Sequence, residues 1–439
     1  MTQAPLSAGV RRGYAMGSVA TGTFGTVPGL LLLPYLTDVL GVAAFVAGII
    51  VFAPKAWDVL LNPVAGRISD RSSSPSGRRR PFLLRGGLAL AACFALLFAG
   101  PTSPSGIAAA YVVVLFLACA TAYAFFQVPY VAMPAELTLD YTERTRLMTW
   151  RVVVLAVAIL LSGATAPMVV DTFDDEVAGH RAMGVYVGLI IAVGVIGAWR
   201  GTRGAPEHRV DTAEGTFGEQ LRLVARARDF RALLITFVLQ ALGVGTMLAG
   251  VAYMSDDVLD SKGAATVLFA AFVGPALLVT PLWERWSATR TKRSGYTAAS
   301  LVMAAGMALV FAAPVGTPVL LYVAAGLTGI GYAGAQVFPM AMLPDAAAHD
   351  AAMTGQNRIG VYTGVWTAGE TLGLALGPAV FAVVIALGGY ESSTAGVDVT
   401  QSSATAWAIR IGFGLLPAAL VALSLLFLPR YGLDEKVNL

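Results

Sequence analysis

The chain has 439 residues, of which 57% are hydrophobic and 13% are charged, whereas soluble domains average about 45–50% apolar and about 25% charged residues. This composition indicates an integral membrane protein. The 29 basic and 26 acidic residues are too nearly balanced for a nucleic-acid-binding protein, and the two cysteines and three histidines are too scattered for an enzyme, a metal site or a cofactor site.

Twelve segments are long and apolar enough to cross a bilayer as helices, which takes about 20 mostly apolar residues. They are residues 14–40, 43–66, 82–101, 106–134, 147–170, 182–199, 232–255, 265–283, 295–313, 317–342, 359–389 and 404–428. The predicted fold class is therefore an all-α integral membrane protein with 12 transmembrane helices.

Basic residues are distributed unevenly between the segments that join these helices. If the N-terminus is cytoplasmic, 24 of the 29 basic residues lie in cytoplasmic segments, and only Arg181 and Lys262 lie in outer loops. Loops that stay in the cytoplasm are enriched in Lys and Arg. The sequence thus predicts a multi-pass protein of the cell (inner) membrane with both termini in the cytoplasm.

The longest polar stretch, residues 200–231, separates the sixth span from the seventh. It predicts an N-terminal six-helix bundle at 1–199, a cytoplasmic inter-bundle loop at 200–231 and a C-terminal six-helix bundle at 232–439. Part of this loop, residues 217–228, has aliphatic side chains among charges, a pattern that fits either a short surface helix or a solvated tether.

Three polar side chains of span two fall on one helical face. Lys55, Asp58 and Asn62 have the spacing of neighbours on a helix surface. Ionisable residues are costly inside a membrane and are functional there by default, so we expect these residues to bind and couple an ion. The alternative is a structural ion pair in which Lys55 and Asp58 neutralise each other.

Span two ends in a cluster of charged residues. Gly66 permits close helix approach, and Asp70 and the arginines can form charge-assisted pairs with neighbouring helix ends. We predict a cytoplasmic gate formed by Gly66, Asp70, Arg71, Arg78, Arg79 and Arg80. A positive-inside anchor would explain the arginines but not the spacing of Gly66 and Asp70.

Spans four and ten share a pattern that indicates an internal duplication. A glutamine precedes an acid by nine residues in both, as Gln127 with Glu136 and Gln336 with Asp345, and the copies are offset by 209 residues. A parallel duplication of six spans predicts two bundles related by a pseudo-two-fold axis, with the substrate site between them, as in the major facilitator fold.

Other polar and aromatic residues within the spans are candidates for substrate binding. They are Tyr123 and Gln127 in span four, Trp150 and Arg151 in span five, and Tyr362, Trp366 and Glu370 in span eleven. The last three repeat every four residues and form one stripe on a helix. Such a stripe is commonly packing, but the carboxylate of Glu370 favours a site.

With these residues the chain resembles the glycoside-pentoside-hexuronide:cation symporter family of the major facilitator superfamily, the group of the melibiose permease. The resemblance covers nearly the whole chain and includes residues 35–41, Trp57-Asp58 with Asn62-Pro63, residues 129–146, and residues 360–373. It implies an alternating-access carrier in which cation binding at span two is coupled to substrate binding between the halves.

The chain departs from this family at several charged positions. Sugar-transporting members have carboxylates where this chain has Gly22, Asn62 and Gln127, and a lysine where it has Thr371. At two further positions around the family's sodium site, Leu61 and Ala124 offer no side-chain oxygen. Sodium needs several oxygen ligands whereas a proton needs only Asp58, so we expect proton coupling, with sodium as the alternative.

The predicted function is symport of a cation and a sugar, glycoside or related small organic solute by a monomeric secondary active transporter. The alternative within transport is efflux or flipping of an amphiphilic lipid or secondary metabolite, which the poorly charged span one favours. A membrane receptor or scaffold would have no reason to keep Asp58, Lys55, Arg151 and Glu370 in the bilayer. A membrane-embedded enzyme is the least favoured class, because this sequence offers no nucleophile–base pair.

Overall fold

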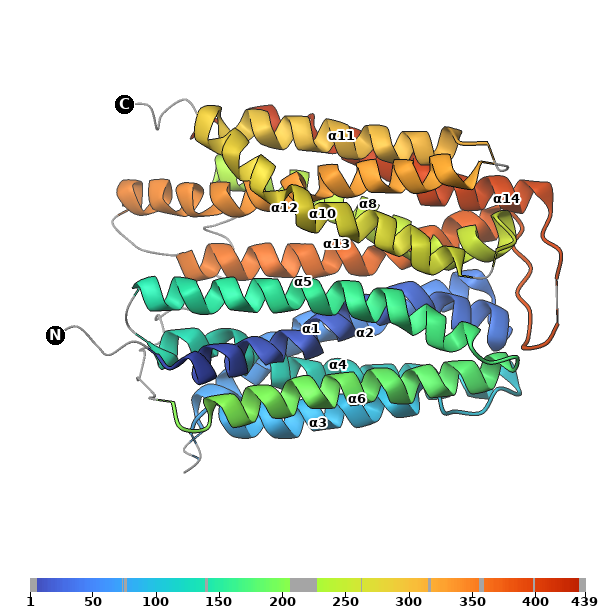
Figure 1. Ribbon diagram of the computed structural model, residues 1–439, viewed down its shortest axis with the longest axis horizontal. Coiled ribbons are helices and arrows are strands. Elements are labelled where there is room, and N and C mark those ends of the chain that lie inside the picture. The colour runs from blue at the N-terminus through green and yellow to red at the C-terminus, as the bar shows by residue number, and fades with distance from the viewer. Residues whose placement is uncertain are drawn as a thin grey trace. The chain divides into compact units, whose positions relative to one another are not determined.

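The computed structural model describes residues 6–72, 74, 77–138, 141–205, 227–261, 263–314, 317–354, 359–397 and 399–433. The chain divides into two compact units, each of which is described by itself (Figure 1). Unit 1 comprises Met1–Thr212 and Ser392–Val399, and unit 2 comprises Ala213–Glu391 and Thr400–Leu439. The predicted surface helix or tether at 217–228 lies almost wholly outside the described residues.

Unit 1 is built from long helices. They are α1 (Ala8–Pro34), continued by the π-helical turn η1 (Tyr35–Val39), α2 (Ala44–Asp70), α3 (Arg80–Leu97), α4 (Ser105–Leu137), α5 (Tyr141–Asp171) and α6 (Glu176–Thr202). Their long apolar stretches favour helices because a helix satisfies every backbone polar group within its own segment.

Unit 2 has a similar series of helices. They are α8 (Arg228–Ala249), continued by α9 (Val251–Tyr253) and the π-turn η2 (Met254–Val258), α10 (Ala264–Thr289), α11 (Lys292–Ala312), α12 (Pro318–Thr354), α13 (Ile359–Leu387), α14 (Ser403–Arg410), the π-turn η3 (Ile411–Leu415), α15 (Leu416–Ser424) and the short 3₁₀ turn η4 (Leu428–Arg430).

The described residues include 12 helical segments long and apolar enough to cross a membrane, so the predicted all-α membrane fold is confirmed. The helices continue beyond the apolar spans: α2 runs to Asp70 and α12 to Thr354. The reason is that hydropathy marks where charged residues begin, whereas a helix can continue into polar surroundings because its hydrogen bonds are internal. The predicted loops were therefore too long.

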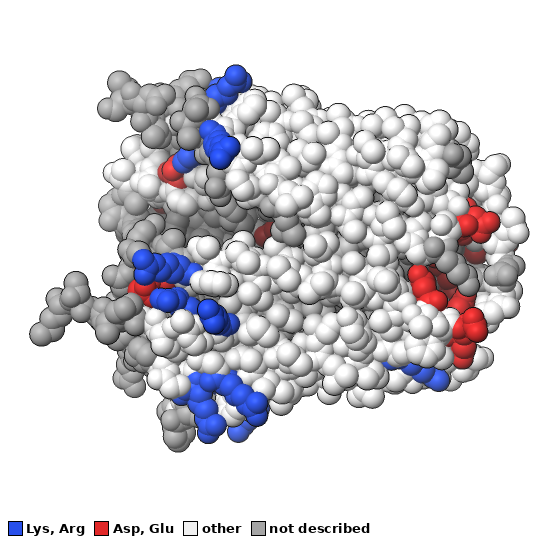
Figure 2. Space-filling model, in the orientation of Figure 1, with Lys and Arg blue, Asp and Glu red and all other residues white. Residues whose placement is uncertain are grey.

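The surfaces of both units are apolar along the helices. Leu60, Leu278 and Leu387 have 68%, 81% and 84% of their surface exposed, which suits contact with lipid. On the face shown in Figure 2, most of the visible Lys and Arg lie near one end of the helices, beside some Asp and Glu, whereas the charged residues near the other end are mostly acidic, and the surface between is almost uncharged.

Helix α1 lies in the interior of unit 1, where it packs against α5 and α6. The approach to α6 is close at Gly13, because a Cβ atom added there would lie 2.4 Å from the Cα of Gly201. Small residues at such crossings let two helix backbones meet, which is a common device in membranes. This packing fixes the polar residues of α1 relative to those of α4 and α5.

A segment from late in the chain completes one end of unit 1. Residues 392–399, here called the strap, follow α13 and pair with the π-turn η1 at the end of α1. The amide nitrogen of Ser393 donates to the carbonyl of Thr37 over 2.9 Å, and that of Ala395 donates to the carbonyl of Val39 over 3.2 Å. The strap thus satisfies carbonyl groups that lie at a helix end.

Among the three π-turns of the described residues, η1 and η2 are a second sign of duplication. The turn η1 begins at Tyr35 and η2 at Met254, so they are offset by 219 residues. Each is followed two residues after its end by a positive φ angle, +65° at Gly41 and +46° at Asp260. Gly and Asp are among the residues that tolerate this conformation, so both halves turn out of their first helix in the same way.

Candidate functional site

The ion-coupling residues predicted in span two lie on α2 of unit 1. Asp58 is buried, with 5% of its surface exposed, and its Oδ1 atom has no hydrogen-bond partner among the described residues. Lys55 forms no ion pair with Asp58 in this part of the chain; its amino group instead lies 4.7 Å from the centre of the Phe24 ring. The alternative of a structural ion pair therefore finds no direct contact among the described residues, although the two charges still interact at longer range.

Tyr123 on α4 connects Asp58 electrostatically with the next polar residues. The charges of both Asp58 and Arg151 act on the Tyr123 hydroxyl, and the Tyr123 ring lies 4.7 Å from that of Phe24. The guanidinium of Arg151 in turn lies 5.6 Å from the centre of the Tyr130 ring. Helices α2, α4 and α5 thus bring Asp58, Tyr123 and Arg151 within electrostatic reach of one another. These residues are called the unit 1 cluster, together with Asn62, one turn after Asp58, and Gln127, one turn after Tyr123.

Several buried polar atoms in unit 1 have no partner among the described residues. Those within the membrane spans are Thr23 Oγ1, Asp58 Oδ1, Asn62 Oδ1, Gln127 Oε1 and Arg151 Nε. Most buried polar atoms in proteins are hydrogen-bonded, so each exception needs an explanation. Four of these atoms are oxygens that can accept a hydrogen bond, and the fifth is the N–H donor of a cationic side chain. A bound polar solute and a cation would satisfy such groups.

Tyr130 is held rigidly beside this cluster. Its hydroxyl donates to the carbonyl of Tyr14 over 3.0 Å and lies 2.9 Å from the Ser18 hydroxyl. The Tyr14 hydroxyl donates back to the carbonyl of Tyr130 over 3.3 Å. These bonds tie α1 to α4, so Arg151 lies against a fixed aromatic ring rather than a mobile one.

The predicted cytoplasmic gate contains a buried ion pair. The Nε atom of Arg79 lies 2.9 Å from Oε1 of Glu136 at the end of α4, and both side chains are buried. Arg79 also donates to the Ser69 hydroxyl over 2.7 Å, and Ser69 donates to the carbonyl of Gly66 over 2.9 Å. This network joins the ends of α2, α3 and α4.

The other gate residues have different positions. Arg80 donates to the carbonyl of Ala205 over 2.6 Å, beyond the end of α6. Arg71 is exposed and Arg78 is half-buried, whereas the side chain of Asp70 lies outside the described residues. Arg79 thus joins the ends of three helices, whereas Arg80 contacts the segment after α6.

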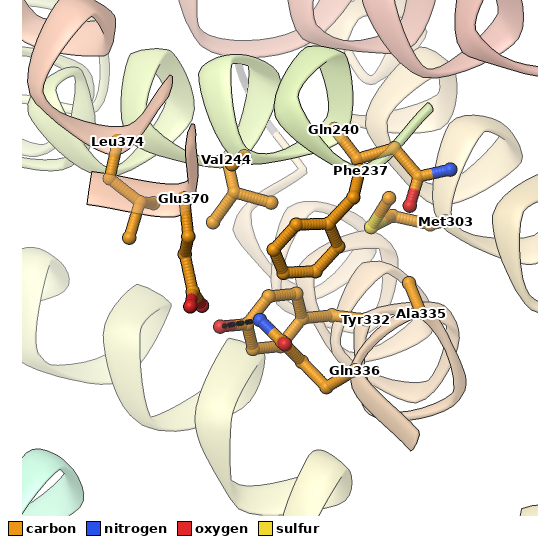
Figure 3. Close-up of a pocket in the computed structure, with 10 residues that line it drawn as sticks. Phe237, Gln240, Val244, Met303, Tyr332, Ala335, Gln336, Glu370 and Leu374 are labelled. Carbon is orange, nitrogen blue, oxygen red and sulfur yellow. Dashed lines mark hydrogen bonds between the residues drawn. The ribbon is translucent and has the colours of Figure 1, made fainter. Parts of the chain in front are cut away.

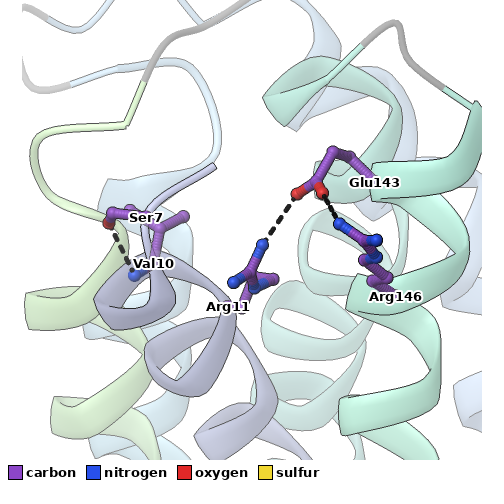
Figure 4. A network of polar contacts seen from close by, with 5 residues as sticks. All are labelled: Ser7, Val10, Arg11, Glu143 and Arg146. Atoms are coloured by element: carbon purple, nitrogen blue, oxygen red, sulfur yellow. Dashed lines mark hydrogen bonds and ion pairs between the residues drawn. The ribbon is translucent and has the colours of Figure 1, made fainter. Parts of the chain in front are cut away.

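A second ion network lies at the same end of unit 1 (Figure 4). Glu143 at the start of α5 accepts from Arg11 of α1 over 3.0 Å and from Arg146 over 2.8 Å. Burial raises the pKa of Glu143, but hydrogen bonds and charges from the two arginines outweigh it, so that this pKa lies below its ordinary value. The carboxylate therefore stays ionised at neutral pH.

Unit 2 repeats the buried ion pair of the gate in a more exposed form. Lys292, the first residue of α11, pairs with Asp345 on α12 over 2.5 Å, and their side chains are 35% and 31% exposed. Glu136 and Asp345 are the acids of the repeat found in the sequence, offset by 209 residues. Each therefore binds a basic residue at the start of the preceding helix, Arg79 at the N-cap of α3 or Lys292 on α11.

The stripe predicted in span eleven is divided between packing and a cavity. Tyr362 lies 4.6 Å from Phe230, and Trp366 stacks 4.2 Å from Phe237, so both rings pack against α8. Glu370 instead lines a small cavity in unit 2 (Figure 3). The structure thus brings Glu370 together with polar groups of α8 and α12 rather than with the two aromatic residues.

The candidate substrate residues do not form one group within a single unit. Tyr123, Gln127 and Arg151 belong to the cluster of unit 1, whereas Glu370 lies in unit 2. Trp150 is 44% exposed, although it precedes Arg151 on α5. The substrate roles of all these residues stay predictions.

Sequence reasoning missed several residues of these networks. Glu136 was noticed for its repeat but not as the partner of Arg79, and Tyr332 beside Gln336 was not singled out. The signal for both was present, since the offset of 209 residues that relates Gln127 to Gln336 also relates Tyr123 to Tyr332. Ser69 and Arg11 gave no pattern that would have marked them.

Comparison with known proteins identifies the kind of protein. The family described as MFS/sugar transport protein matches residues 13–435. The glucuronide carrier protein homolog of Escherichia coli (strain K12) is 24% identical over 97% of this chain and 92% of its own length. The mouse sodium-dependent lysophosphatidylcholine symporter 1 (Mus musculus) is 26% identical over 76% of this chain and 68% of its own length.

A solved structure has the same fold. The crystal structure of the nucleoside transporter NupG superposes with a TM-score of 0.67, covering 97% of this chain and 99% of that chain at 12% identity. At this identity the similarity concerns the fold and not the substrate. It agrees with the predicted major facilitator fold.

Proposed function

The chain belongs to the family of MFS/sugar transport proteins, which are membrane transporters and not enzymes, and from this premise we propose that it is a proton-coupled symporter of a sugar, glycoside or related small organic solute. The resemblance to the glycoside-pentoside-hexuronide:cation symporters is confirmed by the family match and by relatives named as carriers and symporters. Transport by alternating access follows from the family.

The polar cluster of unit 1 is the observation that carries this proposal. Its unpartnered atoms on α2, α4 and α5 include carbonyl and carboxylate oxygens from Asp58, Asn62 and Gln127 and the Nε donor of Arg151. Sugar hydroxyls both donate and accept hydrogen bonds, so a sugar ring can satisfy acceptors and donors of this kind at once. An apolar solute would leave these atoms unsatisfied, which costs about 1–3 kcal/mol for each group.

The proton is favoured because the cluster has a single carboxylate. Asn62 and Gln127 offer neutral amide oxygens, and neutral ligands compensate the dehydration of a cation less well than carboxylates do. A proton needs only Asp58, and it would neutralise a buried charge that has no direct ion pair. Sodium, which the mouse relative's name specifies, is the alternative ion.

An amphiphilic lipid is the second candidate solute. The mouse relative is named for lysophosphatidylcholine, and in this chain Gly22 stands where sugar transporters have a carboxylate. A Cβ atom at Gly22 would already lie 3.2 Å from Leu155 and Ala158 of α5. A side chain at this position would require these neighbours to shift, and the glycine leaves the first helix less polar than in sugar transporters.

We place the protein in the cell (inner) membrane as a monomer, with both termini and the gate around Arg79 on the cytoplasmic side. The uneven distribution of basic residues supports this orientation. In this arrangement the Arg79–Glu136 pair holds the cytoplasmic ends of α3 and α4 together and is released when the carrier opens inward.

Uptake into proteoliposomes tests the proposed function. Radiolabelled glucuronides and glucosides are offered beside lysophosphatidylcholine, with an inward proton gradient or an inward sodium gradient. We expect a glycoside to accumulate with the proton gradient alone. Accumulation of lysophosphatidylcholine but of no glycoside would favour the second solute, and accumulation with sodium alone would favour the other ion.

A further inference from the structure

A second buried carboxylate lies in unit 2, in a cavity of about 10 Å³ between α8, α11, α12 and α13 (Figure 3). Glu370 is the one charged residue among those lining it, and Gln240, Tyr332 and Gln336 are the polar ones. A cavity of this size holds about one water molecule.

The residues facing Glu370 repeat those near Asp58. Tyr332 and Gln336 lie one turn apart on α12 and correspond, at the offset of 209 residues, to Tyr123 and Gln127 on α4. The charge of Asp58 acts on Tyr123, and the charge of Glu370 acts on Tyr332. Each unit therefore places one carboxylate beside a tyrosine–glutamine pair on its fourth long helix.

The hydrogen bonds leave a donor for the carboxyl group. Gln336 Nε2 donates to the Tyr332 hydroxyl oxygen over 2.8 Å, so the proton of that hydroxyl remains available. Figure 3 shows the Glu370 carboxyl group directed toward Tyr332 and Gln336. When Glu370 is ionised, its carboxylate can accept a hydrogen bond from the Tyr332 hydroxyl. When Glu370 gains a proton, the carboxylic acid can donate a hydrogen bond instead.

The surroundings of Glu370 differ from those of Asp58 in charge. Asp58 has the amino group of Lys55 as an electrostatic neighbour, but no charged side chain acts on Glu370 in the described part of the chain. From α8, only Gln240 adds a polar group, and Gln240 is already bound to Ser300, Ser424 and Tyr296. From α11, the lining residue is the apolar Met303.

These observations favour a proton over any other ligand. An ionised carboxylate without a counter-charge is costly inside a membrane, and a bound proton removes that charge. A metal ion would need several further oxygen ligands, whereas the cavity offers Tyr332 and two amide side chains. The cavity has room for about one water molecule, which can deliver a proton to Glu370.

We propose that Glu370, with Tyr332 and Gln336, forms a second proton-binding site of the transporter, distinct from Asp58. This inference rests on the proposed proton-coupled transport and deepens it. The proton comes from water on one side of the membrane, converts the carboxylate to a carboxylic acid, and returns to water on the other side. Glu370 is thus a carrier of the coupling ion in unit 2 rather than a ligand of the solute.

Infrared difference spectra of the purified full-length protein, recorded between acidic and alkaline buffer without any solute, test the site directly. We expect the carbonyl band of a protonated carboxyl group to titrate in the wild type, to lose a component in Glu370→Gln and to keep that component in Asp58→Asn. Tyr332→Phe should shift the component, whereas the matched variant Tyr123→Phe should leave it unchanged. An identical titration in wild type and Glu370→Gln overturns the proposal.

Transport assays of the same variants separate proton binding from solute binding. In Glu370→Gln proteoliposomes we expect counterflow of the transported glycoside to persist and accumulation driven by a proton gradient to fall, with Glu370→Asp restoring accumulation. Loss of counterflow would assign Glu370 to the solute instead and overturn the proposal. The spectra need no solute, so they decide on this site even if the proposed transport of glycosides is wrong.

Discussion

Asp58 is the residue on which proton coupling depends in this account. It is buried in α2, has an oxygen without a partner among the described residues, and is not directly paired with Lys55. Its charge therefore depends on whether a cation is bound. If the Lys55 amino group lay within 4 Å of the carboxylate, Asp58 would form an ordinary structural ion pair. The Lys55 amino group does not lie that close.

The first prediction concerns Asp58→Asn, which keeps the shape of the side chain but removes the titratable charge. We expect the variant to equilibrate solute across the membrane without accumulating it against a gradient. This difference is measured in proteoliposomes, by comparing solute uptake down a solute gradient with solute uptake against one. Accumulation at the wild-type level would contradict the coupling role, and Lys55→Met serves as a comparison that retains the carboxylate.

A second prediction concerns Asp257, which lies in the turn η2 outside the membrane spans. Burial, and then the neighbouring charge of Asp256, raise the pKa of Asp257 from 3.8 to about 7. Because the pKa of Asp257 is higher in the folded than in the unfolded protein, its contribution to the stability of the folded state is fully present below pH 3.8. This contribution is lost as the pH rises through about 7. The ionised form is therefore the destabilising one.

Asp257→Asn should accordingly raise the melting temperature of the detergent-solubilised protein above pH 7 and have little effect near pH 3.8. Thermal unfolding of both proteins across this pH range measures the effect. Asp256→Asn is the comparison: it removes the charge beside Asp257 but keeps the titrating carboxyl group, so its gain should depend less on pH. A gain of Asp257→Asn that is equal at both ends of the range would argue against this titration.

At the scale of the elements, the ends of α2, α3 and α4 are joined by the buried pair of Arg79 and Glu136. Removing one partner of a buried pair typically costs about 3–5 kcal/mol because the other charge is left unpaired. The corresponding pair of Lys292 and Asp345 in unit 2 is about a third exposed, and exposed pairs contribute about 0.2–1 kcal/mol. The two pairs therefore provide a comparison within one molecule.

We predict that Arg79→Met lowers stability and slows transport far more than Lys292→Met. Both variants should bind solute with nearly unchanged affinity, because neither residue belongs to the unit 1 cluster. Turnover in proteoliposomes and thermal unfolding measure the two effects. In the double variant Arg79→Met/Glu136→Met, part of the lost stability should return; a strictly additive loss, or a large loss of solute affinity, would contradict the gate.

The strap is the second element with a definite expectation. Ser393→Pro removes the amide hydrogen that is donated to Thr37, a bond worth about 1 kcal/mol. We expect faster hydrogen–deuterium exchange of the backbone around η1, measured by mass spectrometry. Val397→Ala, at an exposed strap position, is the control. Unchanged exchange in Ser393→Pro would show that the strap does not stabilise the end of α1.

For the whole molecule, the sequence was sufficient to predict the class of fold. Apolar runs and the repeat of Gln127 and Gln336 reflect constraints that act along the chain, namely the thickness of the bilayer and the duplication of six spans. Helix ends were less accurate, because helices such as α12 continue into polar residues.

The contacts of the candidate site were harder to predict, because they join helices that are distant in sequence. Asp58 and Arg151 were identified from the cost of charge in a membrane, but the link through Tyr123 depends on how α2, α4 and α5 pack. Likewise, Tyr362 and Glu370 share one stripe in the sequence, yet the first packs on α8 and the second faces a cavity. Periodicity assigns residues to a helix face but not to the partner of that face.

Proton-coupled solute transport is the central claim, and the pH of a lightly buffered, sodium-free suspension of cells producing the protein tests it most directly. Adding the transported glycoside should make the medium more alkaline, because each solute molecule enters with a proton. A protonophore should abolish the change, and cells with Asp58→Asn should not produce it. Uptake that depends strictly on added sodium, leaves the medium unchanged and is indifferent to the protonophore would contradict the account.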